Sequence, residues 1–364
     1  MNPSVAREKP EAAAATPAAP RLALPSYPWR RLAFGLLALL AVLVVAGALG
    51  SVSVPPVSVL KIVAAKLGII DMPVTISGAW QTIIWEIRLP RIALAAVVGA
   101  GLALSGATYQ GLFRNPLADP YLIGVASGAG LGATVVLLTG IPILYYGFSL
   151  LPIAAFAGGI LAVSSSYLIA RRSGGLPLTT LILAGVAIGS LGSAVTSLLM
   201  IRASPDVRPL FGWLLGGFAG AEWRDVGTLL PYMVLGIVGM MAYSRVLNLF
   251  QLDEEEARQL VVNVERTKLI LVALASLTTA AAVSMSGLIG FVGLVGPHAV
   301  RLVWGRDHRY LLPMSMLVGA GFLVLADLVA RTIVSPSELP VGVVTAFCGA
   351  PFFLYLLQRG RRLV

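Results

Sequence analysis

Side chains that could do chemistry are scarce in this sequence. Two histidines, His298 and His308, and one cysteine, Cys348, are its only imidazole and thiol groups. A zinc site takes three or four such ligands, and a lone cysteine cannot form an internal disulfide. We therefore expect no metal site, no redox centre and no bound cofactor. Both histidines fall near the predicted cytoplasmic face, and we interpret them as structural.

One acid, Asp327, lies well inside an apolar stretch, and Arg331 follows it by one helical turn. This spacing favours a structural ion pair. A self-sufficient secondary transporter would need several ionisable groups at mid-membrane, and an intramembrane enzyme would need a catalytic set there. The sequence also has no G-x-x-x-x-G-K-[ST] phosphate loop. We expect a chain that is not an enzyme, and any uphill transport would be driven by a partner.

The elements that position these residues are membrane helices. The chain is 58% hydrophobic and 12% charged, with 39 glycines, and its mean hydropathy is +0.90. A water-soluble globule does not reach these values, so we expect a multi-pass membrane protein. The net charge is +10. No basic patch interleaved with aromatic residues accompanies it, which argues against nucleic acid as a partner.

Charge-free runs longer than about 20 residues predict the spans. The run 269–300 is ambiguous, since it could be one long helix or two short ones broken at Ser284–Gly290. Two crossings there give ten spans, both termini inside and most Lys and Arg on the cytoplasmic side, whereas one crossing divides the basic residues evenly. The positive-inside rule selects ten spans. We expect residues 1–28 to be a disordered cytoplasmic tail, residues 29–364 the ten-span domain, and the short run 209–221 a re-entrant or half helix.

The stretch 245–268 is a polar island in this apolar chain, and it falls in the largest internal cytoplasmic loop. Asp253 and Glu256 have the spacing of a capping box for a helix over residues 253–265. Four apolar residues then share one face of that helix: Ala257, Leu260, Val261 and Val264. Such a face fits a cytoplasmic partner, or else packing against the rest of the chain.

Eight segments, in order, resemble the FecCD-type permease subunits of binding-protein-dependent ABC importers, over about residues 30–360. They are RLPR at 88–91, GATYQGLFRNPLADPYLIGVASGAGLGA at 106–133, LILAGVAIG at 181–189, GWLLGGFAGAEWRD at 212–225, SGLIGFVGLVGPHAVRL at 286–302, DHRYLLP at 307–313, ADLVAR at 326–331 and ELPVGVVTAFCGAPFFLYLL at 338–357. The resemblance implies ten spans per subunit in the inner membrane, which agrees with the charge count.

The resemblance also implies an assembly. Two permease copies, as a homodimer or with a paralogue, would form a pore above two ABC ATPase subunits that bind ATP and Mg²⁺. A periplasmic or lipid-anchored binding protein would deliver a bulky metal chelate: a ferric siderophore, haem or cobalamin.

The same resemblance assigns roles to individual residues. Arg88, Arg91 and Arg331 would meet acidic residues of the binding protein, and all three fall at the predicted outer ends of spans. The cytoplasmic gate would be formed by Asn115, Leu117, Thr179 and Thr180, although Asn115 before Pro116 is also an ordinary turn choice. The polar island would couple to the ATPase. Here Asp253 and Val261 stand where the family pattern has glycine.

Overall fold

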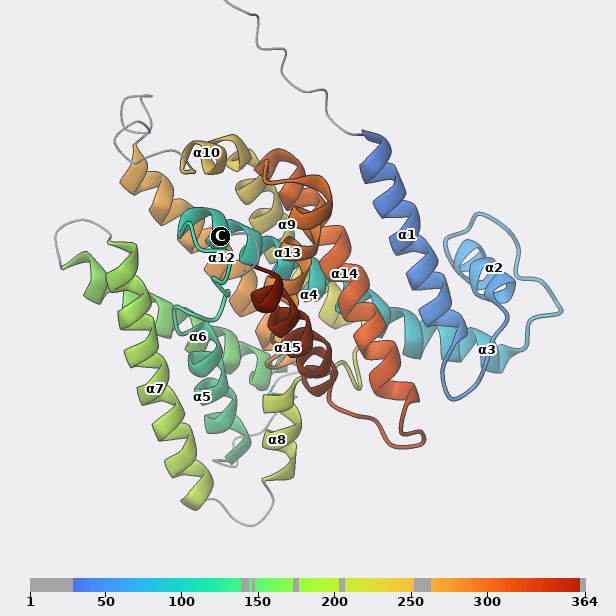
Figure 1. Cartoon of the computed structure of the whole chain (residues 1–364). Coiled ribbons are helices and arrows are strands. Elements are labelled where there is room, and N and C mark those ends of the chain that lie inside the picture. The colour runs from blue at the N-terminus through green and yellow to red at the C-terminus, as the bar shows by residue number, and fades with distance from the viewer. Residues whose placement is uncertain are drawn as a thin grey trace, which may run out of the picture.

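A computed structural model describes residues 29–138, 144–145, 148–172, 177–202, 207–251 and 263–360. The described chain is helical apart from loops and a two-stranded antiparallel ribbon, in which Leu144 is paired with Ser149 and Tyr145 with Phe148 (Figure 1). The elements are α1 (Trp29–Ala48), α2 (Pro56–Lys66), α3 (Gly78–Thr82), the π-helical turn η1 (Ile83–Arg88), α4 (Leu89–Leu112), α5 (Val125–Leu138), β1 (Leu144–Tyr145), β2 (Phe148–Ser149), α6 (Leu150–Arg171), α7 (Leu178–Arg202), α8 (Arg208–Leu215), α9 (Trp223–Ala242), α10 (Ser244–Leu249), α12 (Val264–Ser286), α13 (Val292–Trp304), α14 (His308–Thr332) and α15 (Val341–Gly360).

Seven helical segments are long and apolar enough to cross a membrane: α1, α3 to α4, α6, α7, α9, α12 and α14. Two shorter apolar helices, α5 and the Val341–Leu356 part of α15, accompany them, and α13 has 13 residues. A multi-pass membrane protein is thus confirmed. The count of ten spans stays a prediction, and residues 1–28 lie outside the described residues.

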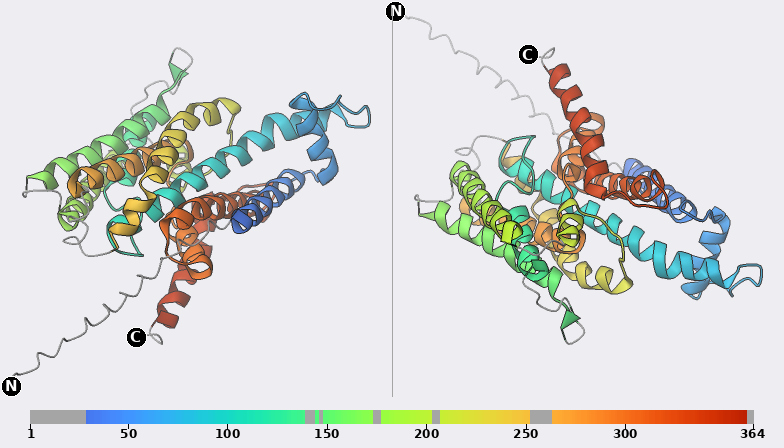
Figure 2. Two further views of the ribbon diagram at one scale, coloured as in Figure 1. Left: turned by 90° about the horizontal axis from the view of Figure 1, so that it is seen from above. Right: turned by 90° about the horizontal axis from the view of Figure 1, so that it is seen from below.

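The centre of the molecule is α4, which is buried at every position from Gly101 to Leu112. Figure 2 shows α5, α6 and α7 on one side of α4, and α1 and α14 on the other. Lipid tails are as apolar as the side chains, so moving an apolar side chain from lipid into a helix contact contributes little free energy. Close van der Waals packing must therefore hold such helices together. Small residues provide that approach: a Cβ atom added at Gly106 would come 2.0 Å from the carbonyl oxygen of Gly293.

The predicted interruption within residues 269–300 is confirmed. The last residue of α12 is Ser286, Gly287 has φ 68°, Phe291 is left-handed, and α13 begins at Val292. The predicted short helix is present as well, as α8, eight residues ending before Gly216. Backbone hydrogen bonds join these two places, because Gly217 N donates to Ser286 O over 2.8 Å.

The bundle has two ends, which differ in the loops and short helices found there. We call the end with α10 and the α13–α14 turn the loop end; the first residues of α1 lie there too (Figure 1). The other end, with the segments 49–55 and 333–340, we call the opposite end. The helices therefore separate the loops of the bundle into two groups, one at each end.

Candidate functional site

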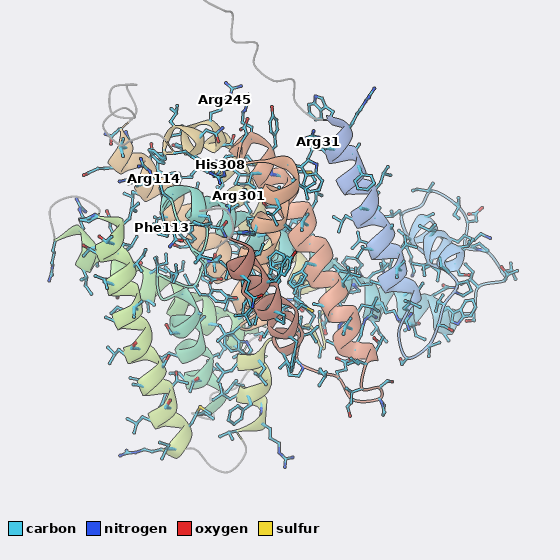
Figure 3. All side chains as sticks on the ribbon, in the orientation of Figure 1. Arg31, Phe113, Arg114, Arg245, Arg301 and His308 are labelled. Atoms are coloured by element: carbon cyan, nitrogen blue, oxygen red, sulfur yellow. The ribbon has the colours of Figure 1, made fainter. Side chains whose placement is uncertain are left out.

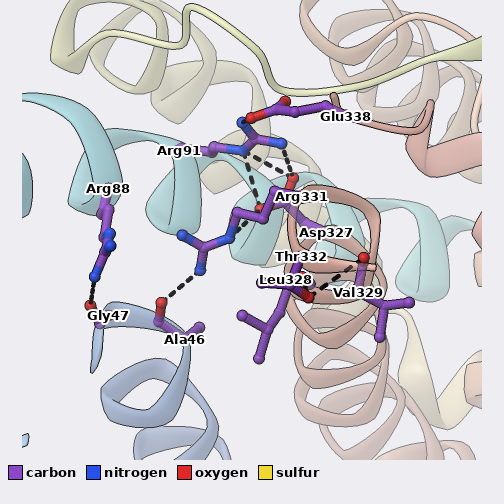
Figure 4. A network of polar contacts seen from close by, with 10 residues as sticks. All are labelled: Ala46, Gly47, Arg88, Arg91, Asp327, Leu328, Val329, Arg331, Thr332 and Glu338. Carbon is purple, nitrogen blue, oxygen red and sulfur yellow. Dashed lines mark hydrogen bonds and ion pairs between the residues drawn. The ribbon is translucent and has the colours of Figure 1, made fainter. Parts of the chain in front are cut away.

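A buried ion pair dominates the opposite end. The Arg91 guanidinium, from the first turns of α4, donates to Asp327 of α14 through Nε at 2.9 Å and Nη2 at 2.8 Å (Figure 4). Its Nη1 donates to both carboxylate oxygens of Glu338, at 2.9 and 2.8 Å. Asp327 is 1% exposed. One arginine therefore holds together α4, α14 and the 333–340 segment.

The other two arginines predicted for docking bind backbone carbonyls. Arg88 Nη1 donates to Gly47 O over 2.8 Å, and its Nη2 also donates to Val52 O. Arg331 Nη2 donates to Ala46 O, and its Nε lies 3.7 Å from Asp327 Oδ2. The last carbonyls of a helix have no intrahelical partner and carry partial negative charge. Two guanidinium groups thus cap the end of α1, as Figure 4 shows.

These contacts bear on the docking prediction without deciding it. Arg88 and Arg91 are buried, and each of the three guanidinium groups has partners within the chain. The expected Asp327–Arg331 pair exists, but Arg91 makes the shorter contact with Asp327. The role of Glu338 was not found from the sequence. It lies in a quoted motif, and its signal is an acid directly before Leu-Pro, next to the end of a span.

The predicted gate residues lie where the sequence placed them. Asn115 and Leu117 are in the loop between α4 and α5, where Asn115 Oδ1 accepts a hydrogen bond from Leu117 N at 2.9 Å. That is a side-chain-stabilised turn, as expected of Asn before Pro. Thr179 and Thr180 are in the first turn of α7; Thr179 is exposed and Thr180 partly buried. Their function as a gate stays a prediction.

The loop that carries Asn115 continues into the interior. Tyr121 donates its hydroxyl to Ile289 O over 2.9 Å and accepts from Ile289 N over 3.2 Å, so it satisfies the backbone at the interruption between α12 and α13. Asp119 accepts from Tyr121 N at 2.8 Å. Burial raises the pKa of the Asp119 carboxyl to about 6, although this hydrogen bond acts to lower it. Both residues belong to a quoted motif, and neither was singled out.

Most of the predicted coupling residues lie outside the described residues: Asp253, Glu256, Ala257, Leu260 and Val261. Val264 is described, and it is buried in the first turn of α12. Asn263 is extended and caps α12, with its side chain accepting from Arg266 N over 3.0 Å. A helix continuous over residues 253–265 is therefore wrong at its C-terminal end, because an Asn cap breaks it at 263.

The two histidines have different surroundings. His298 packs edge-on against Phe352 and Phe353 of α15, and His308 Nδ1 lies 2.9 Å from Asn248 Oδ1. In the described part of the chain, no group of three or more His, Cys, Asp or Glu is placed to hold a metal ion.

Comparison with known proteins identifies the family of this chain. Residues 37–359 match the FecCD transport family. The chain belongs to that family. A FecCD relative, the cobalamin import system permease protein BtuC of Halobacterium salinarum, is 52% identical over 278 residues, which cover 76% of this chain and 74% of the relative. The hemin transport system permease protein HmuU of Yersinia pestis is 45% identical over 286 residues, covering 76% and 84%.

A solved structure described as the inward-facing conformation of a metal-chelate type ABC transporter also resembles this FecCD chain. Its TM-score is 0.79 at 35% sequence identity, with 92% of this chain and 100% of the other covered. The FecCD chain is thus an integral membrane protein with the fold of an ABC importer permease, and it is a transporter component rather than an enzyme.

Proposed function

We propose that this chain is the inner-membrane permease subunit of an ABC importer that moves a bulky metal chelate. Two copies, or one copy with a paralogue, form the pathway, and two cytoplasmic ABC ATPase subunits bind ATP and Mg²⁺. A periplasmic or lipid-anchored binding protein delivers the cargo. Both termini and the 245–268 segment face the cytoplasm. The chain itself binds no cofactor and no nucleic acid.

The observation that carries this proposal is membership of the FecCD family over residues 37–359. Relatives at 52% and 45% identity are named for cobalamin import and hemin transport. Both cargoes are large metal-centred chelates, so cobalamin and haem are the first cargoes to test, and a ferric siderophore is the third.

The structure gives little support to the alternative, a self-sufficient secondary transporter. Such a protein needs a mid-membrane acid that is free to bind and release a coupling ion. Asp327, the acid that lies well inside an apolar stretch, is engaged by two nitrogen atoms of Arg91 and lies near the Arg331 guanidinium. A carboxylate held in this way is a structural group.

Residue roles follow from the proposed function. Asn115, Leu117, Thr179 and Thr180 narrow the cytoplasmic exit of the pathway. Asp253, Glu256, Ala257, Leu260 and Val261 contact the ATPase. Arg88, Arg91 and Arg331 meet acids of the binding protein, a role for which their internal contacts would have to open.

Uptake by purified components tests the function. The chain is reconstituted in liposomes with its genomically neighbouring ATPase and binding protein, and uptake of labelled cobalamin, haemin and a ferric siderophore is measured. We expect uptake of one chelate that requires all components and internal ATP. Uptake by the permease alone, driven by a proton or sodium gradient, would establish the secondary transporter instead.

A further inference from the structure

A basic cavity at the loop end lies beside the predicted gate, because Pro116, between Asn115 and Leu117, is part of its lining. It has a volume of about 380 Å³, and its lining includes Gln110, Arg114, Gln251, His298, Arg301 and Arg306. Among the described residues that line it there are three arginines and no acid. Figure 3 shows Arg114 and Arg301 close together at this end, near His308. The cavity therefore has a strong positive bias.

Arg301 is held in place at the cavity by a fixed partner. Its Nη2 donates to Gln110 Oε1 at 2.5 Å, and Gln110 Nε2 donates in turn to Gly293 O at 3.0 Å. The other terminal nitrogen, Arg301 Nη1, is buried and has no hydrogen-bond partner among the described residues. A buried charged donor without a partner is costly, so this nitrogen needs an acceptor that the described residues do not supply.

A second buried nitrogen behaves in the same way. His298 precedes Arg301 by three residues on α13, so both side chains lie on one face of that helix. His298 Nδ1 is also buried without a partner in the described part of the chain. The aromatic edges of Phe352 and Phe353 confine its ring. His298 and Arg301 thus both line the cavity, and each has one buried nitrogen without a partner among the described residues.

We propose that this cavity binds a phosphate group, from an anionic phospholipid or from free phosphate. A phosphate group has several acceptor oxygens that point in different directions, so it can accept hydrogen bonds from nitrogens of separate side chains. The guanidinium group of an arginine also matches the geometry of phosphate. The place suits a lipid headgroup. Leu302 lines the cavity and is 63% exposed. Trp304 is the last residue of α13, and tryptophan is enriched at the level of the lipid headgroups.

Thermal unfolding of the purified full chain in detergent tests binding. Inorganic phosphate is titrated against chloride at matched ionic strength, and native mass spectrometry then follows retention of phosphatidylglycerol against phosphatidylcholine. Arg306→Gln removes an exposed cavity arginine, and Arg245→Gln is the control, since Arg245 is exposed at the same end but does not line the cavity. His298→Gln and Arg301→Gln remove the orphaned nitrogens.

We expect phosphate to raise the melting temperature, with half-saturation about tenfold higher in Arg306→Gln and unchanged in Arg245→Gln. Phosphatidylglycerol retained by the wild type and lost in Arg306→Gln identifies the lipid as the source; a response to inorganic phosphate alone identifies the free ion. Equal responses of Arg306→Gln and Arg245→Gln would overturn the proposal. So would a response that appears only after Asp253, Glu254, Glu255 and Glu256 are neutralised, because the chain's own acids would then fill the cavity.

Discussion

Arg91 and Asp327 are 236 residues apart in the sequence, yet the Arg91 Nη2 atom lies 2.8 Å from Asp327 Oδ1 in the interior of the bundle. Since Nε of the same guanidinium also contacts the carboxylate, the geometry is bidentate and fixes how α4 crosses α14. Removing one partner leaves an uncompensated buried charge, which costs far more than the pair contributes on balance.

We therefore expect Asp327→Asn to lower the free energy of unfolding by about 3 kcal/mol or more. The matched control is Asp307→Asn, which breaks a partly exposed pair with Arg309 and should lower the melting temperature much less. Thermal melts of the purified chain in detergent compare the two. Equal melting temperatures for both variants would mean that the Arg91–Asp327 pair does not hold the helices.

Arg88→Gln separates a structural role from a docking role. The guanidinium caps the last carbonyls of α1, so a purely structural role predicts a lower melting temperature with little change in the affinity for the binding protein. The docking prediction requires the reverse: an unchanged melt, weaker association and a smaller dependence of association on salt. Binding is measured by surface plasmon resonance at several salt concentrations, with Arg224→Gln as a second arginine variant for comparison.

Coupling to the ATPase is tested by Ala257→Asp together with Leu260→Asp, which places two charges on the proposed contact face. We expect loss of ATPase co-purification in detergent at an unchanged melting temperature. Val264 is unsuitable for this purpose, since it is buried in α12, and Val264→Asp should lower the melt by itself. An unchanged yield of complex with the Ala257/Leu260 variant would place the coupling site elsewhere.

Tyr121→Phe removes one hydroxyl and leaves both polar groups of Ile289 without that partner. We expect a loss of about 1 to 3 kcal/mol, because the interruption between α12 and α13 depends on this hydroxyl for its hydrogen bonds. Hydrogen exchange should speed up at residues 287–291 in particular. Tyr232→Phe, on an exposed side chain, is the control. If hydrogen exchange at residues 287–291 is the same in the two variants, the Tyr121 hydroxyl does not stabilise the interruption between α12 and α13.

Asp119 predicts a pH dependence of stability. Its pKa is raised to about 6 in the folded chain, so between roughly pH 4 and 6 the folded state binds more protons than the unfolded state. Stability should therefore fall as pH rises through this window. Asp119→Asn should remove that part of the pH profile of the melting temperature. A wild-type profile that is flat or rises from pH 4 to 6 would contradict the assignment.

The sequence predicts local interruptions well and distant partners poorly. The short helix α8 follows from the length of its charge-free run, which is a local property. The break near Gly287 follows from the charge bias summed over all loops. The contact of Arg91 with Glu338 depends on the angle at which α4 crosses α14, and no local sequence pattern predicts that crossing angle. Val264 was included in the predicted 253–265 helix because its apolar spacing continues that of Leu260, while the capping of α12 by Asn263 is a weak signal in the sequence.

The gate remained a prediction for a physical reason. Thr179 is exposed in a single chain, and a pathway that forms between subunits or against a soluble partner leaves no internal contact to recognise. Arg301 gave no signal of its own in the sequence. It was one basic residue among several near the predicted cytoplasmic face, and only its partnership with Gln110 shows that it is oriented.

The junction of α8 with its neighbours is made by main-chain atoms. Gly217 N donates to Ser286 O at 2.8 Å, and Val341 N donates to Gly216 O at 2.9 Å. Peptide groups are common to every residue type except for the N–H that proline lacks. The side chains of Ser286 and Val341 can therefore change during evolution without loss of the hydrogen bonds that join α8, α12 and α15. Gly216 cannot change in this way, because its φ is 70° and an added Cβ atom would lie 2.6 Å from Leu288 O.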